Sequence, residues 1–292
     1  MSTKTKVIVG DSICGGAKEN KIPSDDETFY LRGFNTYTGG NPSVSALSHE
    51  GAGQIVAAIN GTVEITDRVV SVKGSASRYL PEIGDVVVGR ITEVAGSRWL
   101  VDVNAHQNAI MLLSNVTEPG GMLRRRNRGD ELGMRQLFDQ EDLIAAEVQR
   151  ISPEGTISLH SRGTEKYGRL SGAGQFVQVR ASLVKRAKHQ FFTLVTVPVS
   201  IILGMNGYIW ISGVKEKAVD GADRSNITRV ANCITVLGIR GIEVYQKTIE
   251  AILDNSLSMS LSLFDILSEE HHSQLVANVS ETTTKRVKVD YS

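Results

Sequence analysis

Arginine is concentrated in one short stretch, "LRRRNR", which places Arg124, Arg125, Arg126 and Arg128 within five residues. The guanidinium group is planar, stays charged at cellular pH and donates paired hydrogen bonds to phosphate or carboxylate oxygens. This stretch can therefore bind an anion, either the phosphates of a nucleic acid or the carboxylates of an acidic protein. A solvated loop would have the same composition, so the cluster alone does not decide among the three.

Basic side chains recur in "SRGTEKYGR" and "LVKRAKH". Residues 124–188 contain thirteen basic residues and eight acidic ones, an excess of five, whereas the whole chain has 32 of each. An anion-binding surface must therefore be local. From these clusters and from neighbouring strand and loop positions we predict RNA contacts at Arg90, Trp99, His106, Arg124, Arg125, Arg126, Arg128, Arg150, His160, Arg162, Lys166, Arg169, Lys185, Arg186 and Lys188.

Five short runs of alternating apolar and polar residues between 84 and 162 predict five β-strands that would carry many of these side chains. In "RWLVDV", Trp99, Val101 and Val103 fall on one side and Asp102 on the other. Five strands spaced as a meander, with one long insertion, fit an OB-fold barrel, which binds oligonucleotides on a strand face and adjoining loops. Other small β-barrels have the same spacing. The insertion, 114–142, contains the arginine cluster and predicts a short helix that buries Leu132, Leu137 and Phe138.

The segments on either side of the barrel predict two further domains. Residues 1–77 are rich in glycine and small polar residues and contain strand-like runs at 54–59 and 62–72, which predict a small β domain. The last third combines strands with helical spacing, which predicts an α+β module. There we expect an amphipathic helix over 181–190 and a later helix that ends at Gly238.

The stretch "LGMNGYIWI" contains a Gly-x-x-Gly loop at residues 204–207. In KH domains such a loop clamps the backbone of single-stranded RNA, but there it joins two helices. Here it lies between two apolar, strand-like runs, and the pair Asn206-Gly207 suits the positive φ angles of a tight hairpin. We therefore predict that Gly204, Asn206 and Gly207 form a structural turn that serves folding or domain packing.

Several motifs in one order, "EIGDVVVGRITEV", "PGGMLRRRNRGDELGMR", "LHSRGTEKYGRL", "SLVKRAKHQFF" and "ILGMNGYIWI", resemble the RNA-binding cap subunits of the eukaryotic RNA exosome. The resemblance runs from about Gly33 to Ile211. It implies a multidomain, β-rich plus α+β fold: an N-terminal β domain, an OB-fold barrel of the S1 type, and a C-terminal KH-type domain. The expected limits are 1–77, 78–168 and 169–280, with a flexible tail at 281–292.

The same resemblance implies a scaffold role without catalysis. The partners would be single-stranded RNA, other cap subunits and a ring of six subunits similar to phosphorolytic ribonucleases. RNA 3′ ends would be guided into the central channel for degradation or processing, including ribosomal RNA maturation. The implied locations are the nucleus, with the nucleolus, and the cytoplasm. Two alternatives stay open: a ribosome-associated or translation-related OB-fold factor, and an exonuclease that carries OB and KH appendages, although 292 residues leave no room for a phosphorolytic core.

The residue pattern itself argues against an enzyme. No close set of carboxylates suits two metal ions, no Gly-Lys-Ser or Gly-Lys-Thr occurs, and the histidines lack ligand spacing except for the adjacent His271 and His272. That pair, in "SEEHHSQL", is typical of the polar face of a helix. Cys14 and Cys233 are too isolated for a metal site or a disulfide framework. We expect no cofactor, no membrane segment and a reducing intracellular environment.

Overall fold

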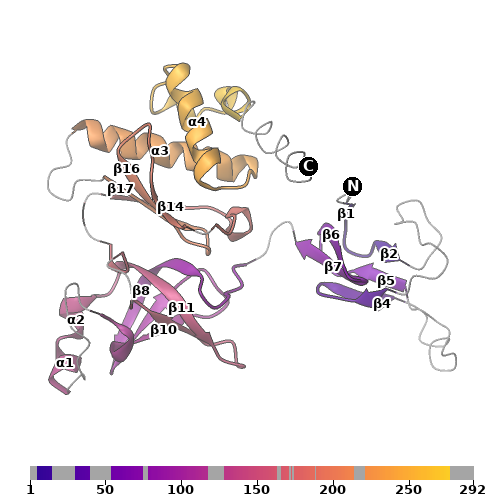
Figure 1. The fold of residues 1–292 in the computed structure, drawn as a ribbon, viewed down its shortest axis with the longest axis horizontal. Coiled ribbons are helices and arrows are strands. Elements are labelled where there is room, and N and C mark those ends of the chain that lie inside the picture. Colours follow the sequence, from indigo (N-terminus) through magenta and orange to yellow (C-terminus); the bar gives the residue numbers. More distant parts are fainter. Residues whose placement is uncertain are drawn as a thin grey trace. The chain divides into compact units, whose positions relative to one another are not determined.

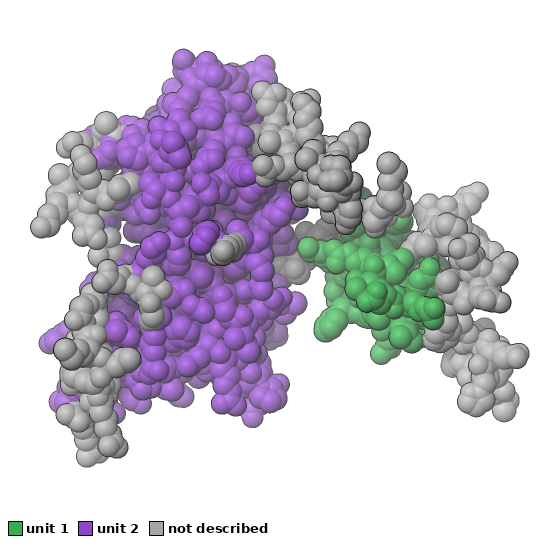
Figure 2. Space-filling model, viewed as in Figure 1, with its two compact units in different colours: residues 1–77 green, residues 78–292 purple. Residues whose placement is uncertain are grey.

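The computed structural model describes residues 5–14, 30–39, 54–74, 78–117, 128–162, 166–170, 172, 174–187, 189–213 and 221–276. The chain divides into two compact units, Met1–Ser77 and Arg78–Ser292, which Figure 2 colours separately. Within the described part, no helix combines the length and the apolar character needed to cross a lipid bilayer.

The first unit contains two small sheets, as expected for a β domain. One has the order β1-β6-β7-β3, from β1 (Lys6–Val7), β3 (Leu31–Arg32), β6 (Gly61–Thr66) and β7 (Val69–Gly74). The other has the order β2-β5-β4, from β2 (Ser12–Cys14), β4 (Thr36–Gly39) and β5 (Gln54–Ala57). Ile13, Ile55 and Val70 belong to the small core of this unit. The run predicted at 62–72 is two strands, because Asp67 and Arg68 both adopt positive φ (47° and 80°) and turn the chain.

The second unit begins with the predicted five-stranded barrel. Its strands are β8 (Val86–Ala95), β9 (Arg98–Asp102), β10 (Ala109–Leu112), β11 (Leu143–Ile151) and β12 (Ile157–His160). They pair in the order β12-β10-β9-β8-β11, and an additional pairing between β12 and β11 closes the barrel. The short strand β13 (Gly168–Arg169) pairs with Ile144 and Ala145, near the start of β11. The fold class expected for this part of the chain is confirmed.

Alternation along the strands fills the barrel, with Val101, Ile144 and Leu159 buried in one core. The insertion after η1 (Leu113–Asn115) contains two short helices, α1 (Arg128–Leu132) and α2 (Met134–Leu137). Phe138 is buried and Leu137 packs against the same core, as predicted. The prediction for Leu132 is wrong, because that side chain is 90% exposed and Met134 is buried instead.

An antiparallel sheet and two helices complete the unit. The sheet order is β14-β17-β16-β15, from β14 (Gly174–Gln178), β15 (Phe191–Thr193), β16 (Val199–Leu203) and β17 (Tyr208–Gly213). The helix α3 (Gly221–Arg240) packs on one face of this sheet, and α4 (Gln246–Ser258) packs against α3 on the same side (Figure 1). Three further pieces pack against the same core: the 3-10 turns η2 (Ala181–Leu183) and η3 (Asp265–Leu267), and a helical segment at 269–276.

Two helix predictions in this region are wrong. Residues 181–190 do not form an amphipathic helix: after η2, Val184 forms a parallel bridge with Val244, and the Lys185 N–H donates to the Val244 carbonyl at 3.2 Å. Long-range pairing has overridden the local helical pattern. The helix expected to end at Gly238 continues to Arg240, and Gly241, with φ 68°, follows it.

Candidate nucleic-acid interface

An apolar layer joins the barrel to the four-stranded sheet. Val88 and Ala145, on the outer face of β8 and β11, pack with Ile202, Tyr208 and Trp210 from the sheet. These residues are 9% exposed or less. The sheet is therefore covered by helices on one face and by the barrel on the other, so the two domains form one packed structure.

The Gly-x-x-Gly loop is a hairpin turn between β16 and β17, not a helix-to-helix connection. The Gly204 N–H donates to the Tyr208 carbonyl, and the Gly207 N–H donates to the Gly204 carbonyl, both at 3.0 Å. Gly207 adopts φ 84°, which is the left-handed position of a three-residue hairpin loop. The expectation that Asn206 also has positive φ is wrong, because only Gly207 has it in this loop.

The loop is buried against the barrel. Asn206 has no exposed surface, and its side-chain amide donates to the carbonyls of Val88 at 2.7 Å and Val103 at 3.1 Å. The Asn104 side chain donates in return to the Asn206 carbonyl at 3.0 Å. Because the barrel covers the polar groups of this turn, the loop cannot approach an RNA backbone as a KH clamp does.

A buried carboxylate provides a second polar link across the seam between the barrel and the four-stranded sheet. Asp85, 4% exposed, accepts hydrogen bonds from the Tyr79 hydroxyl at 2.8 Å, from the Glu82 N–H at 3.0 Å and from the Arg186 guanidinium. Arg186 also lies 2.7 Å from the Glu82 carboxylate. Burial, together with the Asp85 carboxylate, raises the pKa of Tyr79 above its ordinary value. Arg186, a predicted RNA contact, is thus engaged in joining the domains.

Arg90 and Arg169 flank β11 on two neighbouring strands. Arg90 lies 3.5 Å from the Glu141 carboxylate and 5.8 Å from the ring centre of Phe176, while Arg169 lies 2.9 Å from the Asp142 carboxylate. Both arginine side chains stay almost half exposed. They can therefore contact a phosphate only in competition with an acidic neighbour.

Other predicted contacts occupy separate positions. His106 and Arg150 are exposed on the barrel, whereas His160 and Arg162 are half-buried. The Arg162 guanidinium donates to the Ser114 carbonyl, and its backbone N–H donates to Nδ1 of His160 at 3.3 Å. The structure therefore does not gather all the predicted residues on one surface.

Trp99 was wrongly predicted to contact RNA. The side chain has no exposed surface, its Nε1–H donates to the Phe138 carbonyl at 3.0 Å, and its ring packs edge-on against Phe138. It is the largest fully buried residue of the barrel core. The alternation that placed Trp99 inward with Val101 and Val103 was the correct signal.

Part of the predicted surface lies outside the described residues. This applies to Arg124, Arg125, Arg126 and Lys188, and to the side chain of Arg128, although Arg128 begins α1. Lys185 is described: it lies 3.8 Å from the Glu243 carboxylate and 5.1 Å from the ring centre of Tyr245.

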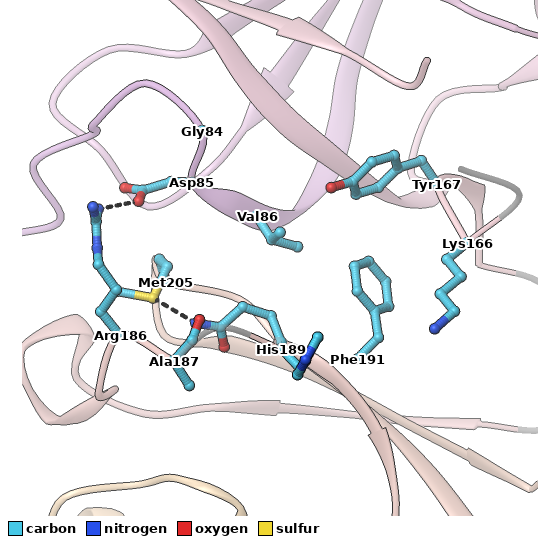
Figure 3. A pocket seen from close by; sticks show the side chains of 11 residues that line it. Gly84, Asp85, Val86, Lys166, Tyr167, Arg186, Ala187, His189, Phe191 and Met205 are labelled. Atoms are coloured by element: carbon cyan, nitrogen blue, oxygen red, sulfur yellow. Dashed lines mark hydrogen bonds and ion pairs between the residues drawn. The ribbon is translucent and has the colours of Figure 1, made fainter. Parts of the chain in front are cut away.

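A pocket of about 330 Å³ opens at the seam beside Asp85 and Arg186 (Figure 3). Its aromatic wall consists of Tyr167 and Phe191, whose ring centres lie 5.5 Å apart in an edge-to-face arrangement. The Tyr167 hydroxyl donates to Glu147 at 2.8 Å, and burial raises the pKa of this tyrosine. Sequence reasoning missed both rings, although each follows a basic residue closely, in "EKYGR" and "KHQFF".

The described residues contain no cluster of potential metal ligands. No group of three or more His, Cys, Asp or Glu side chains gathers in that part of the chain. The helical segment at 269–276 agrees with the prediction for "SEEHHSQL", but His272 is only 2% exposed, so it belongs to the buried side rather than the polar face. Cys233, on α3, is buried in the core that the helices share with the sheet, and burial raises its pKa to about 11.

Comparisons with known proteins agree with this arrangement. The family model described as "RRP4, S1 domain" matches residues 78–150, and the model described as "KH domain" matches residues 174–217. An exosome complex component RRP4 of Bos taurus is 37% identical, covering 94% of this chain and 89% of the relative. The Arabidopsis thaliana homolog is 32% identical, covering 98% and 90%, and the Schizosaccharomyces pombe component is 37% identical, covering 82% and 75%.

The barrel packed on its α+β partner thus defines a protein of the class that joins an S1 domain to a KH domain. The sequence identity to the three relatives extends over 82–98% of this chain and identifies the family within this class. The chain belongs to the RRP4 family of exosome complex components.

Proposed function

We propose that this chain is a non-catalytic, RNA-binding cap and scaffold subunit of an RNA exosome. The observation that carries the proposal is the S1-type barrel fixed to a KH-type domain, in a chain 37% identical to an exosome complex component over 94% of its length. In this role it guides RNA 3′ ends toward other subunits that perform 3′-to-5′ degradation and processing, including ribosomal RNA maturation. It acts in the nucleus, including the nucleolus, and in the cytoplasm.

Its proposed partners are single-stranded RNA, other cap subunits and ring subunits similar to phosphorolytic ribonucleases. The buried Gly-x-x-Gly turn is consistent with RNA contacts elsewhere on the molecule, at exposed polar side chains of the S1 barrel such as His106 and Arg150 and at the arginine cluster. A positively charged groove that follows the backbone is the usual means of binding single strands without sequence preference.

RNA binding and its dependence on salt test this function. The purified chain should bind a single-stranded oligoribonucleotide and release no nucleotides from it in the presence of magnesium or phosphate. Replacing Arg124, Arg125 and Arg126 with alanine should flatten the plot of log affinity against log salt by about 0.7 for each phosphate that is no longer neutralised. An unchanged slope would remove the cluster from the RNA surface. Nuclease activity that disappears with a point substitution in this chain would contradict the non-catalytic role.

A further inference from the structure

The pocket at the seam between the S1 barrel and the KH-type sheet has no role in the interface described so far. We propose that it holds one nucleotide of a single-stranded RNA, with the base against the aromatic wall and a phosphate at the rim. The inference rests on the proposed RNA-binding function and gives it a specific location.

Size and position favour a small, partly polar ligand. A volume of about 330 Å³ lies at the lower end of the range for ligand pockets. Figure 3 shows Val86 and Tyr167 on one side of the open centre, with His189 and Phe191 across from them. The walls come from the start of the barrel, from the segment before β13 and from the segment that leads into β15.

The aromatic wall is held in place before any ligand arrives. Tyr167 and Phe191 support each other at an angle of 69°, and the bond from the Tyr167 hydroxyl to Glu147 fixes the first ring. Phe191 is only half-buried, so part of its ring borders the pocket. Stacking on such a ring accepts any base, as expected for a protein that handles many RNAs.

Free donors stand beside this wall. The Lys166 ammonium is exposed and lies 5.6 Å from the ring centre of Phe191, and the exposed His189 also lines the pocket. Neither side chain forms a hydrogen bond or ion pair with the residues that the structure describes. An ammonium next to an aromatic face suits the phosphate that follows a stacked base.

The carboxylate at the pocket does not oppose an anion. Asp85 is buried and is bound by Arg186 and by the Tyr79 hydroxyl, while Glu82, which shares the same guanidinium, does not line the pocket. Asp85 and Arg186 lie across the pocket from Lys166 (Figure 3). Lys166 is then the uncompensated charge among the pocket's described Asp, Glu, Lys and Arg residues. An acidic peptide would also bind an ammonium, but it would make no use of the paired rings, which favours a nucleotide.

Fluorescence anisotropy with a labelled oligouridylate tests the site in the full chain. Lys166→Gln and Phe191→Leu should each weaken binding about tenfold, while Lys247→Gln, on an exposed turn of α4, should leave it unchanged. Because Lys166 is exposed, its variant tests the site even if Phe191→Leu disturbs the sheet. Oligonucleotides containing 4-thiouridine should crosslink to Tyr167 or Phe191, as located by mass spectrometry.

The outcomes separate the pocket from the proposed function. Undiminished affinity in both variants, with crosslinks elsewhere, would overturn the nucleotide site and leave RNA binding intact. No binding by the parent chain would contradict both. If the two variants bind a polyglutamate peptide more weakly than the parent but bind RNA equally well, the pocket belongs to an acidic protein partner and the proposal is overturned.

Discussion

The side-chain amide of Asn206 donates a hydrogen bond to the backbone carbonyl of Val88, 2.7 Å away and 118 residues earlier in the chain. One residue of the KH-type hairpin thus completes the hydrogen bonding of a barrel strand. The same amide reaches the Val103 carbonyl at 3.1 Å. The Gly-x-x-Gly loop, which clamps RNA in other KH domains, here fixes the orientation of two domains.

Asn206→Ala should lower the free energy of unfolding of the second unit by about 1–3 kcal/mol, because two buried carbonyls lose their donor. Chemical denaturation measures this change. Asn108→Ala, at an exposed loop position of the same barrel, is the matched control and should have little effect. Equal stability of the two variants would show that the Asn206 bonds do not hold the domains together.

Gly207→Ala should destabilise the protein more than Gly96→Ala does. Both glycines have positive φ, so each substitution introduces backbone strain of about 1–2 kcal/mol. Around Gly96 a new Cβ meets nothing within 4 Å, whereas at Gly207 it would clash with the Val179 carbonyl. Melting temperature and RNA affinity are measured together. A Gly207→Ala variant that melts like the parent but no longer binds RNA would restore the clamp interpretation.

Arg186→Ala should reduce stability by about 1–3 kcal/mol, since it removes a charged hydrogen bond from the buried Asp85. Tyr79 and the Glu82 N–H still bind that carboxylate, which limits the loss. Lys185→Ala is the comparison, because its pair with Glu243 is exposed on both sides and should contribute less than about 1 kcal/mol. If both variants unfold at the same denaturant concentration, the Asp85 link is not a structural one.

Tyr208 predicts a loss of stability at high pH. Burial, with the nearby Asp102 carboxylate 3.1 Å from the hydroxyl, raises its pKa from 10 to about 12. The folded protein therefore retains this proton more tightly than the unfolded chain. The resulting stability is fully present below pH 10 and disappears as the pH rises from 10 to 12.

Denaturation of the parent and of Tyr208→Phe across that interval isolates this group. Tyr79 and Tyr167 also have raised pKa values and act in the same direction, but they contribute equally to both proteins. The parent should lose more stability than the variant between pH 10 and pH 12. Parallel curves would contradict the assignment to Tyr208.

The barrel could be predicted because its signal is local. Along "RWLVDV", alternation placed Trp99, Val101 and Val103 on one side, and the structure buries all three in the barrel core. Leu132 follows a helical pattern too, but α1 has only five residues and leaves that side chain exposed. A pattern identifies a face, and tertiary packing decides whether anything covers it.

The seam could not be predicted from local patterns. The segment after η2 looked helical, yet its partner is Val244, some sixty residues later. Similarly, the sequence predicts phosphate contacts for both Arg186 and Lys166, because both are basic. The folded chain gives them different roles: Arg186 binds the Asp85 carboxylate, whereas Lys166 borders the pocket. The domain limits at 168 and 280 and the roles of the arginine cluster stay predictions.

The proteins that accompany this chain in the cell decide whether it works as an exosome cap subunit. The tagged chain should be purified from its own cells at moderate salt and the bound proteins identified by mass spectrometry. We expect ring subunits similar to phosphorolytic ribonucleases, together with other cap subunits, in comparable amounts. Recovery of ribosomal subunits without any ring subunit would contradict the cap role and support the translation-related alternative.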